Sequence, residues 1–488
     1  MDTDFDIIVI GAGISGINAG YRIQTELPDY KYTILESRGA IGGTWDLFRY
    51  PGIRSDSDLH TFGFPWRPWS QKKVIAEGSA IRNYVKESAE QYGIDRKIQF
   101  HHKVLAGDWS TDEQRWALSV DADGEKTTFY ARFIIFSTGY YDYNEPLQTS
   151  IPGIENFKGK VIHPQFWPEG YDYSNKRMII IGSGATAVTL LPVVAEKAAR
   201  VTMLQRSPSY VIPLPSEDAS TNILGRVLPQ WLTFKIVRWK FLILPFLFFH
   251  FCRTFPNAAR KEMRKRTLEN LPKTIAHDPN FNPRYNPWEQ RLCVCPDGDF
   301  FKALAKGNAD IVTDTIRTVT EHGITTANGT ELDADVIVTA TGLKVQLAGG
   351  ARLSIDGRRF EPSESFMWKG MMLQDLPNAA FVIGYTNASW TLGADSTAVQ
   401  VCRLLKLMDG RGQASATPSV AKGQRLSVGS VMNLNSTYLE RAKGQLPKAG
   451  DAGPWRPRNN HLKDLWVAAY GDLTTGMRFS DGGKKSIR

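Results

Sequence analysis

Two short, continuously apolar runs, each followed by a glycine-rich turn and then a helical pattern, organise the chain. Residues 5–10 precede the turn at 11–16, and residues 177–181 precede the turn at 182–187. Continuous β-branched runs are typical of parallel strands that are buried on both faces. The pattern therefore predicts two strand–turn–helix units, each of which begins a Rossmann-like domain.

The spacing of the small residues in both turns indicates dinucleotide binding. Gly11 permits the tight bend, Gly13 lets the backbone approach a pyrophosphate, and Gly16 allows close helix packing. The helix that follows offers unpaired N–H groups and a partial positive charge to that pyrophosphate. The second turn repeats the pattern, so its residues are predicted to bind the second dinucleotide: Gly182, Ser183, Gly184, Ala185, Thr186 and Ala187.

The residue that ends the next strand indicates which dinucleotide each turn holds. Glu36 ends the strand at 31–35, twenty residues beyond Gly16, where a carboxylate accepts hydrogen bonds from ribose hydroxyls and repels a 2′-phosphate. In the second unit the strand at 201–204 is followed by Gln205, Arg206 and Ser207. A guanidinium there can bind the 2′-phosphate of NADPH through two parallel hydrogen bonds. NADPH is thus favoured over NADH; the alternative for Arg206 is a solvated surface arginine.

Two further stretches carry a family resemblance. Residues 42–56 are dense in glycine, aromatic and charged residues, which is typical of a functional loop. They fit the [A/G]GxWxxxx[F/Y]P[G/M]xxxD signature of Baeyer–Villiger monooxygenases, and residues 157–168 fit that family's FxGxxxHxxxWP fingerprint. The chain resembles this family over almost its whole length, most of all its ethionamide-activating subgroup.

The resemblance implies that the first site holds FAD and the second NADPH. It also implies a catalytic role for Arg291, with Asp56 orienting it by charge-assisted pairing; a structural salt bridge is the alternative for Arg291. A guanidinium suits that chemistry because it supplies positive charge without donating its proton. The family tends to place a lysine before its catalytic arginine, where this chain has Gln290. The FAD contacts implied beyond the glycines are Ser15, Glu36, Thr44, Trp45, Asp46, Leu47, Arg54, Ser55, Asp56 and Val104.

The predicted fold class is α/β, with two Rossmann-like dinucleotide-binding domains and a helical insertion in the second. Strand ends at residues 133–139 and 336–342 resemble the (A/S)TG connections between such domains. The predicted division is 1–145 for the first part of the FAD domain, 146–211 for the linker and first part of the NADPH domain, 212–287 for the insertion, 288–340 for the second part of the NADPH domain and 341–488 for the rest of the FAD domain, ending in a frayed tail.

Charge changes this picture in one segment only. The net charge is +9, and residues 221–270 hold ten Lys and Arg against two Glu, so a local partner is favoured over nucleic acid. Within that segment residues 241–252 are strongly apolar, but a bilayer span needs about 20 such residues. They predict either a buried helix or an interfacial patch that rests on anionic membrane.

Cysteine and histidine usage excludes several other classes. The four cysteines include no CxxC pair, which disfavours a disulfide framework and a disulfide reductase. No metal-ligand spacing occurs among the eight histidines, so no metal is expected. A strand beginning near Phe5 leaves no room for a signal peptide, and the expected location is the cytoplasm, with or without membrane association.

Taken together, the resemblance implies an NADPH- and O2-dependent FAD monooxygenase. A C4a-peroxyflavin would convert ketones to esters or lactones and would S-oxygenate sulfides and thioamides. The nearest alternative is an N- or S-oxygenating flavin-containing monooxygenase, whose fingerprint has Tyr or Phe where this chain has Trp167. A flavoprotein that only binds a membrane or partner is a third class.

Overall fold

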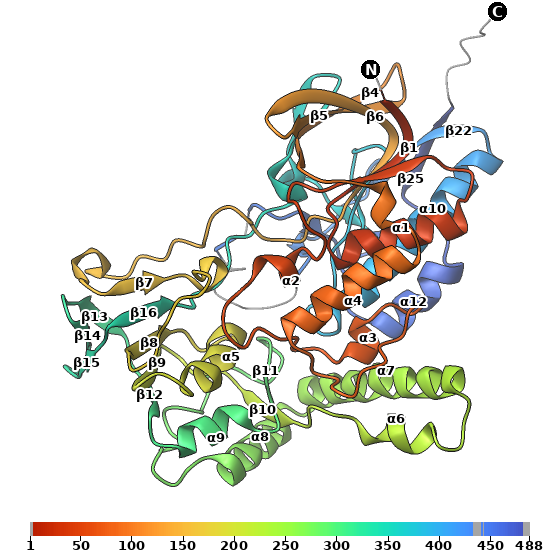
Figure 1. Cartoon of the computed structure of the whole chain (residues 1–488). Helices are drawn as coiled ribbons and strands as arrows, with labels where there is room; N and C mark the ends of the chain where they lie inside the picture. Colours follow the sequence, from red (N-terminus) through yellow and green to blue (C-terminus); the bar gives the residue numbers. More distant parts are fainter. Residues whose placement is uncertain (1–2, 433–440, 443, 482–488) are drawn as a thin grey trace, which may run out of the picture.

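The computed structural model (Figure 1) describes residues 3–432, 441–442 and 444–481. The tail predicted to be frayed at 482–488 lies outside these residues. One mixed and one parallel sheet, with helices packed against them, form two neighbouring lobes, and a third group of helices lies along the lower edge of the view. The predicted α/β class with two Rossmann-like units is confirmed. The domain boundaries stay predictions.

The first sheet is built around β1, whose buried apolar run pairs in parallel with strands on both sides. Ile10 lies opposite Leu35 on one side and Phe136 on the other. Helices α1, α4 and α10 cover the sheet. The parallel strands are β1 (Thr3–Ile10), β2 (Tyr32–Leu35), β3 (Ile98–Gln99), β6 (Glu125–Phe136) and β21 (Ala379–Phe381), and the helices are α1 (Ile14–Glu26), α4 (Gly78–Gln91) and α10 (Trp390–Gly410).

An extension that is antiparallel except for the parallel pair β4–β17 enlarges this sheet. Strand β6 continues through β5 and β4 to β17 and β18, and β19 and β20 lead into β21. Short elements complete the lobe: α2 (Thr44–Leu47), α3 (Leu59–Phe62), α12 (His461–Tyr470), β4 (His102–Ser110), β5 (Arg115–Ala122), β17 (Arg352–Ile355), β18 (Arg358–Phe360), β19 (Met367–Trp368), β20 (Met372–Leu373), β22 (Gln413–Pro418), β23 (Gly429–Ser430), β24 (Lys448–Ala449) and β25 (Met477–Asp481).

The second sheet has the order β12-β9-β8-β16-β7 and is parallel throughout. The fingerprint segment at 157–168 contributes its edge strand, β7, which pairs with β16. The elements are β7 (Lys160–Ile162), β8 (Arg177–Ile181), β9 (Arg200–Gln205), β12 (Ala309–Thr313), β16 (Val336–Thr339), α5 (Ala185–Val194) and α9 (Asp299–Ala305), with a small antiparallel sheet of β13 (Ile316–Val319), β14 (Gly323–Thr326) and β15 (Glu331–Asp333).

The chain crosses between the two lobes twice, and the two crossings lie side by side. Tyr141 forms an antiparallel bridge with Val345. The amide of Asp142 donates to the carbonyl of Lys344 at 2.7 Å. The Lys344 ammonium also pairs with the Asp142 carboxylate at 3.0 Å. The outgoing and returning segments are therefore bonded to each other.

Three helices follow β9 before the chain returns to the second lobe. Helix α7 runs through Pro245 and spans 25 residues, so it extends well beyond the predicted apolar stretch. It packs against α3, and His461 at the start of α12 contacts it, while α8 lies beneath α9 in Figure 1. No helix among the described residues is long and apolar enough to cross a membrane. The elements are β10 (Val211–Leu214), α6 (Ala219–Leu224), α7 (Gln230–Thr254), α8 (Pro256–Asn270) and β11 (Cys293–Pro296).

Candidate active site

The first glycine-rich turn leaves no room for a side chain at its first and last glycines. Gly11 has φ +102°, and a Cβ there would lie 2.8 Å from the carbonyl oxygen of Ser137. A Cβ on Gly16 would lie 1.9 Å from the carbonyl oxygen of Gly11. Gly13 precedes α1 without any side-chain cap, so the first N–H groups of this helix are available to a ligand.

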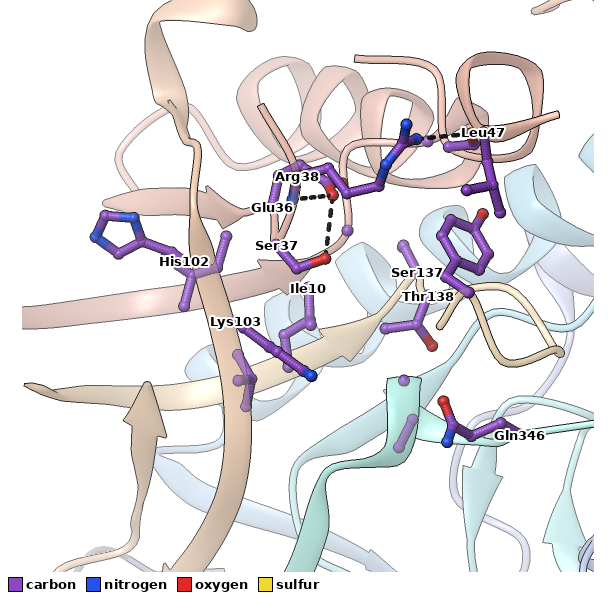
Figure 2. Close-up of a pocket in the computed structure, with 18 of the residues that line it drawn as sticks. Ile10, Glu36, Ser37, Arg38, Leu47, His102, Lys103, Ser137, Thr138 and Gln346 are labelled. Carbon is purple, nitrogen blue, oxygen red and sulfur yellow. Dashed lines mark hydrogen bonds between the residues drawn. The ribbon is translucent and has the colours of Figure 1, made fainter. Parts of the chain in front are cut away.

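A cavity opens at this turn (Figure 2). Its side chains come from the ends of β1, β2 and β6, from β4 and from the returning crossing. The hydroxyl of Ser137 is buried there and has no hydrogen-bond partner among the described residues. The lining residues are Ile10, Gly11, Gly13, Leu35, Glu36, Ser37, Arg38, Gly43, Leu47, His102, Lys103, Val104, Ser137, Thr138, Tyr141, Tyr143, Asn144, Gln346, Ala348 and Gly349.

Glu36 lies in this cavity at the end of β2 and is held there by backbone donors. Its Oε2 accepts from the Ala12 amide at 2.7 Å, and its Oε1 accepts from the Arg38 amide at 2.9 Å. Burial raises the pKa of Glu36, and these two hydrogen bonds oppose the rise. The carboxylate keeps further lone pairs that can accept from a ribose hydroxyl. The bare turn, the free helix end and the unpaired Ser137 hydroxyl fit the pyrophosphate-bearing FAD that the sequence implies.

The other residues predicted to contact FAD fall into three groups. Gly11, Gly13, Glu36, Leu47 and Val104 line the cavity. Thr44 and Ser15 lie beside it as hydrogen-bond partners: the Tyr141 hydroxyl donates to Thr44 Oγ1 at 2.7 Å, and Trp390 Nε1 donates to Ser15 Oγ at 3.0 Å.

The third group does not line the cavity. Trp45 and Arg54 line a separate cleft of about 620 Å³ between α4, α5 and the segment before α9. The Ser55 hydroxyl donates to the carbonyl of Ser57 at 2.6 Å. The roles predicted for these residues stay predictions.

Three arginines pair with the Asp46 carboxylate. It is buried, and its carboxylate pairs with Arg38 at 2.7 Å, Arg49 at 2.8 Å and Arg82 at 3.7 Å. This cluster fixes α2 beside the strand end that carries Glu36. The predicted contact between Asp46 and FAD stays a prediction.

Sequence reasoning missed several lining residues. Lys103 and His102 precede the predicted Val104 on β4, and Tyr141, Tyr143 and Gln346 come from the two crossings. The only available signal was adjacency to Val104 or to the serine–threonine–glycine strand end. The crossings meet the cavity because they leave and rejoin the first lobe at that edge.

The second turn repeats the geometry of the first. Gly182 has φ +137°, and a Cβ there would lie 2.3 Å from the carbonyl oxygen of Ala340. In contrast, no described heavy atom lies within 4 Å of a Cβ on Gly184, so the space above that backbone is open. Ala187 is fully buried, and α5 starts at Ala185 without a side-chain cap.

Arg206 is exposed at the end of β9, next to this turn. Its neighbour Ser207 accepts through its carbonyl from the Ser183 hydroxyl at 2.8 Å, which joins the strand end to the turn. The guanidinium makes no hydrogen bond or ion pair within the described part of the chain. A free cation at this strand end can bind an anionic group on a dinucleotide ribose.

The fingerprint segment is packed against the second lobe. A Cβ on Gly159 would lie 2.5 Å from the carbonyl of Asp335. Trp167 is buried, with its ring 6.1 Å from that of Tyr173. Burial lowers the pKa of His163, and a hydrogen bond with the backbone of Gly342 partly opposes the shift. The histidine is therefore neutral at pH 7 and links the segment to the second threonine–glycine connection.

Asp56 and Arg291 share one electrostatic environment. Burial raises the pKa of the Asp56 carboxyl, and the nearby charges of Arg291 and Arg54 oppose this rise, with Arg291 the stronger of the two. No ion pair of 4 Å or less joins the described side chains of Asp56 and Arg291. Arg291 is exposed, and its guanidinium has no hydrogen-bond partner among the described residues. An anion can therefore approach it.

Cys293 and Tyr50 place these two residues at the second turn. Cys293 Sγ lies 3.9 Å from the Ser183 carbonyl oxygen, and burial raises its pKa to about 12, with Asp56 and Arg291 both acting on it. Tyr50 makes a hydrogen bond with Thr186, and burial raises its pKa while Asp56 adds to the rise. The loop at 42–56 thus connects the first cavity to the second turn.

The loop is also fixed to the second lobe by an ion pair between Arg54 and Asp299 at the start of α9. No group of three or more metal-ligating side chains occurs among the described residues. The arrangement brings together two dinucleotide turns, an unpaired cation and a carboxylate. Such a set could hold two dinucleotides and stabilise an anion near the second.

Two protein-family models match parts of the chain. A family model described as flavin-binding monooxygenase-like matches residues 68–228. A model of an NAD(P)-binding Rossmann-like domain matches residues 9–74.

Several relatives match nearly end to end. The FAD-containing monooxygenase EthA of Mycolicibacterium smegmatis is 45% identical over 471 residues, covering 96% of each chain. The putative FAD-containing monooxygenase MymA of Mycobacterium tuberculosis is 44% identical and covers 98% of this chain and 97% of its own. The probable FAD-binding monooxygenase AlmA of Acinetobacter baylyi is 43% identical, covering 99% and 96%.

Solved structures share the fold at lower identity. An oxidised steroid monooxygenase bound to NADP has a TM-score of 0.74 at 21% identity, covering 98% of this chain and all of the other. Cyclohexanone-bound cyclohexanone monooxygenase gives 0.74 at 20% identity, covering 99% and 100%.

Proposed function

This chain belongs to the FAD-containing monooxygenases, and we propose that it uses NADPH and O2 to convert ketones to esters or lactones and to S-oxygenate sulfides and thioamides. The substrate is a small molecule. When bound, FAD reduced by NADPH would activate O2, of which one atom enters the substrate and the other leaves as water. The protein contributes binding, orientation and charge.

The first lobe would hold FAD through the turn at 11–16, where the bare backbone and the end of α1 receive the pyrophosphate. Glu36 would accept hydrogen bonds from the adenosine ribose, and the unpaired Ser137 hydroxyl can serve the cofactor. The second lobe would hold NADPH at the turn 182–187. Arg206 would bind its 2′-phosphate, since this exposed guanidinium has no partner among the described residues.

The observation that carries the oxygen-transfer assignment is the state of Arg291. Its exposed guanidinium is unpaired among the described residues, yet it lies in the field of the Asp56 carboxyl and next to Cys293 at the second turn. A guanidinium stabilises a developing negative charge on oxygen without giving up its proton. Asp56 would keep Arg291 directed toward the reacting atoms. We assign Arg291 a catalytic role and Asp56 an orienting role.

Product analysis with labelled O2 tests this function. Purified holoenzyme would receive NADPH, a linear ketone and an aryl methyl sulfide, and mass spectrometry would detect the label. A labelled ester supports the proposal. Labelled sulfoxide without ester would instead assign the chain to the N- and S-oxygenating flavin monooxygenases.

Two arginine variants sharpen the test. Arg291→Ala is expected to lower ester formation at least 100-fold, on the order of one lost transition-state donor. Arg284→Ala removes an exposed guanidinium from the same segment and is the matched control. Equal ester yields from both variants would contradict the role of Arg291. Flavin reduction by NADPH, measured separately, shows whether the cofactor sites remain intact.

The insertion at 212–287 bears on where in the cell the reaction takes place. We propose that the enzyme acts in the cytoplasm and associates peripherally with anionic membrane through this segment. Its basic charge and exposed apolar side chains support the association. We also propose the domain division given by the sequence, which limited proteolysis between the lobes would test.

A further inference from the structure

Helices α6, α7 and α8 carry a concentration of exposed apolar side chains. Of the 17 large hydrophobic side chains exposed among the described residues, eleven come from this segment. Trp231 is 61% exposed, Trp239 54%, and Leu244 and Leu247 55% each. A patch of this kind marks an interaction surface. We call the part of it that lies on α7 the α7 outer face: Trp231, Ile236, Trp239, Ile243, Leu244, Leu247 and Phe251.

Positive charge surrounds this face. Helix α7 contains no acidic residue, and the exposed cations Lys235 and Arg253 lie toward its two ends. The Lys235 ammonium lies 5.1 Å from the centre of the Trp231 ring. The two glutamates of α8 are paired within their own helix, Glu262 with Arg266 and Glu269 with Lys265. Apolar bulk bordered by tryptophan and cations matches the interface of an anionic bilayer.

The first half of the inner face of α7 contacts the lobe that holds the first cavity. Arg238 donates to the backbone carbonyls of His60 and Gly63, beside α3. Leu242 packs with Tyr385 and Leu392, and its carbonyl oxygen lies 3.0 Å from His461 Nε2. Leu392 belongs to the first turn of α10, two residues after Trp390, which bonds Ser15 at the nucleotide turn.

The second half of the inner face contacts the segment that carries the candidate catalytic arginine. The ring of Phe249 lies 5.5 Å from that of Trp288. Phe248 packs with Tyr210 and Leu292, so Arg291 lies between two residues that touch α7 or its cluster. One helix therefore contacts both sides of the proposed site and presents its opposite side to the surroundings.

We infer that the α7 outer face lies on an anionic bilayer, and that substrates are lipid-dissolved ketones and sulfides that reach the site past α7. This inference rests on the proposed oxygenation. A helix of 25 residues is about 37 Å long, so α7 can lie flat in the interface. A second copy is the less suitable occupant, because two such faces would bring like charges together.

Vesicle sedimentation tests the surface without requiring turnover. Wild-type holoenzyme is expected to sediment with phosphatidylcholine–phosphatidylglycerol vesicles at low salt and to be released by high salt. Trp239→Ser/Leu247→Ser is expected to lower the partition coefficient by roughly tenfold or more. Lys235→Gln/Arg253→Gln is expected to lower it about fivefold per cation, and only on anionic vesicles.

Val428→Ser is the matched control, because Val428 is 69% exposed but lies outside the three helices. Its binding should equal that of the wild type. Failure of the wild type to bind anionic vesicles would overturn the inference. So would a dimer in solution that the Trp239→Ser/Leu247→Ser variant converts to monomer.

Substrate delivery requires a second comparison. We would measure kcat/KM for a water-soluble short ketone and for a long-chain methyl ketone dissolved in anionic vesicles. For the Trp239→Ser/Leu247→Ser variant, kcat/KM should fall roughly tenfold with the vesicle-borne ketone. Its kcat/KM with the soluble ketone should equal that of the wild type. Equal rates of the variant and the wild type on the vesicle-borne ketone would overturn delivery past α7. Absence of any oxygenated product from the wild type, with its vesicle binding intact, would instead count against the proposed oxygenation.

Discussion

A Cβ atom on Gly182 would lie only 2.3 Å from the carbonyl oxygen of Ala340. The same relation holds in the first lobe, where a Cβ on Gly11 would lie 2.8 Å from the carbonyl oxygen of Ser137. In both lobes the backbone of the residue just before a threonine–glycine pair lies against the first glycine of the nucleotide turn. The two turns are thus shaped by the same local contact.

This contact separates the effects of two alanine substitutions in the second turn. Gly182→Ala introduces a clash at φ +137° and should destabilise the protein by about 1–3 kcal/mol. Gly184→Ala meets no described atom within 4 Å and should change stability by no more than about 0.5 kcal/mol. Its methyl group instead occupies the space above the turn, so the KM for NADPH should rise.

Thermal unfolding and steady-state kinetics of the two glycine variants check this pair. Equal stability losses in both would contradict the open space over Gly184. An unchanged KM for NADPH in Gly184→Ala would place the pyrophosphate elsewhere.

The second prediction concerns coenzyme preference. Arg206→Gln removes a charged donor worth about 1.5–3 kcal/mol to a bound phosphate, so KM for NADPH should rise about tenfold or more. KM for NADH should stay nearly constant, because NADH lacks that phosphate. Arg200→Gln is the control, since Arg200 is exposed at the other end of β9 and pairs with Asp310 of β12 at 3.2 Å. An equal rise in KM for NADPH and for NADH would show that Arg206 does not bind the 2′-phosphate.

Asp56 gives a prediction about pH. Its pKa is raised in the folded protein by burial, so the folded state binds this proton more tightly than the unfolded chain does. The contribution to stability is present in full below the unfolded pKa of about 3.9 and is lost as pH rises through the folded-state pKa. Asp56→Asn avoids this loss and should be more thermostable than the wild type at neutral pH, with the difference shrinking in acid.

The same substitution should lower ester formation, because a neutral amide holds Arg291 less firmly. Asp58→Asn is the comparison variant, since an amide oxygen can still cap α3 at the Thr61 amide. Its ester yield should match that of the wild type. If Asp56→Asn lost stability at neutral pH, the charged carboxylate would be a net stabilising partner and the assigned burial effect would be wrong.

Asp46 provides a prediction on folding. Asp46→Ala leaves three arginines without their shared carboxylate. The free energy of unfolding should fall by about 1–3 kcal/mol. This loss is smaller than that for breaking a fully buried ion pair, because the three arginines are partly exposed. Arg49→Ala removes only the most exposed partner and should cost less than about 1 kcal/mol. Urea denaturation of the FAD-loaded protein would measure both, and equal losses would contradict the central position of Asp46.

The sequence predicted those parts of the site that depend on local geometry. Gly11 and Gly182 could be recognised because only glycine tolerates their turns, and Glu36 and Arg206 follow from the strand that comes next. Arg291 and Asp56 came from a resemblance, since nothing local marks an arginine whose partner lies more than 200 residues away.

Other features depend on contacts that sequence order hides. The arginine cluster around Asp46 joins α2 to α4, and Tyr141 enters the cavity only because the crossings lie there. The apolar stretch in α7 could equally have been core, because composition is the same for a buried helix and a lipid-facing one. Only the burial of Val237 and Leu242 shows which side of α7 faces the protein core.

The paired crossings have a mechanical consequence. A single connecting strand would let one lobe swivel about the chain axis, whereas two bonded strands resist torsion and still bend. The bridge between Tyr141 and Val345, with the Asp142–Lys344 pair beside it, therefore stiffens the connection against twisting. Rotation of one lobe about the connection would have to break the bridge or the ion pair.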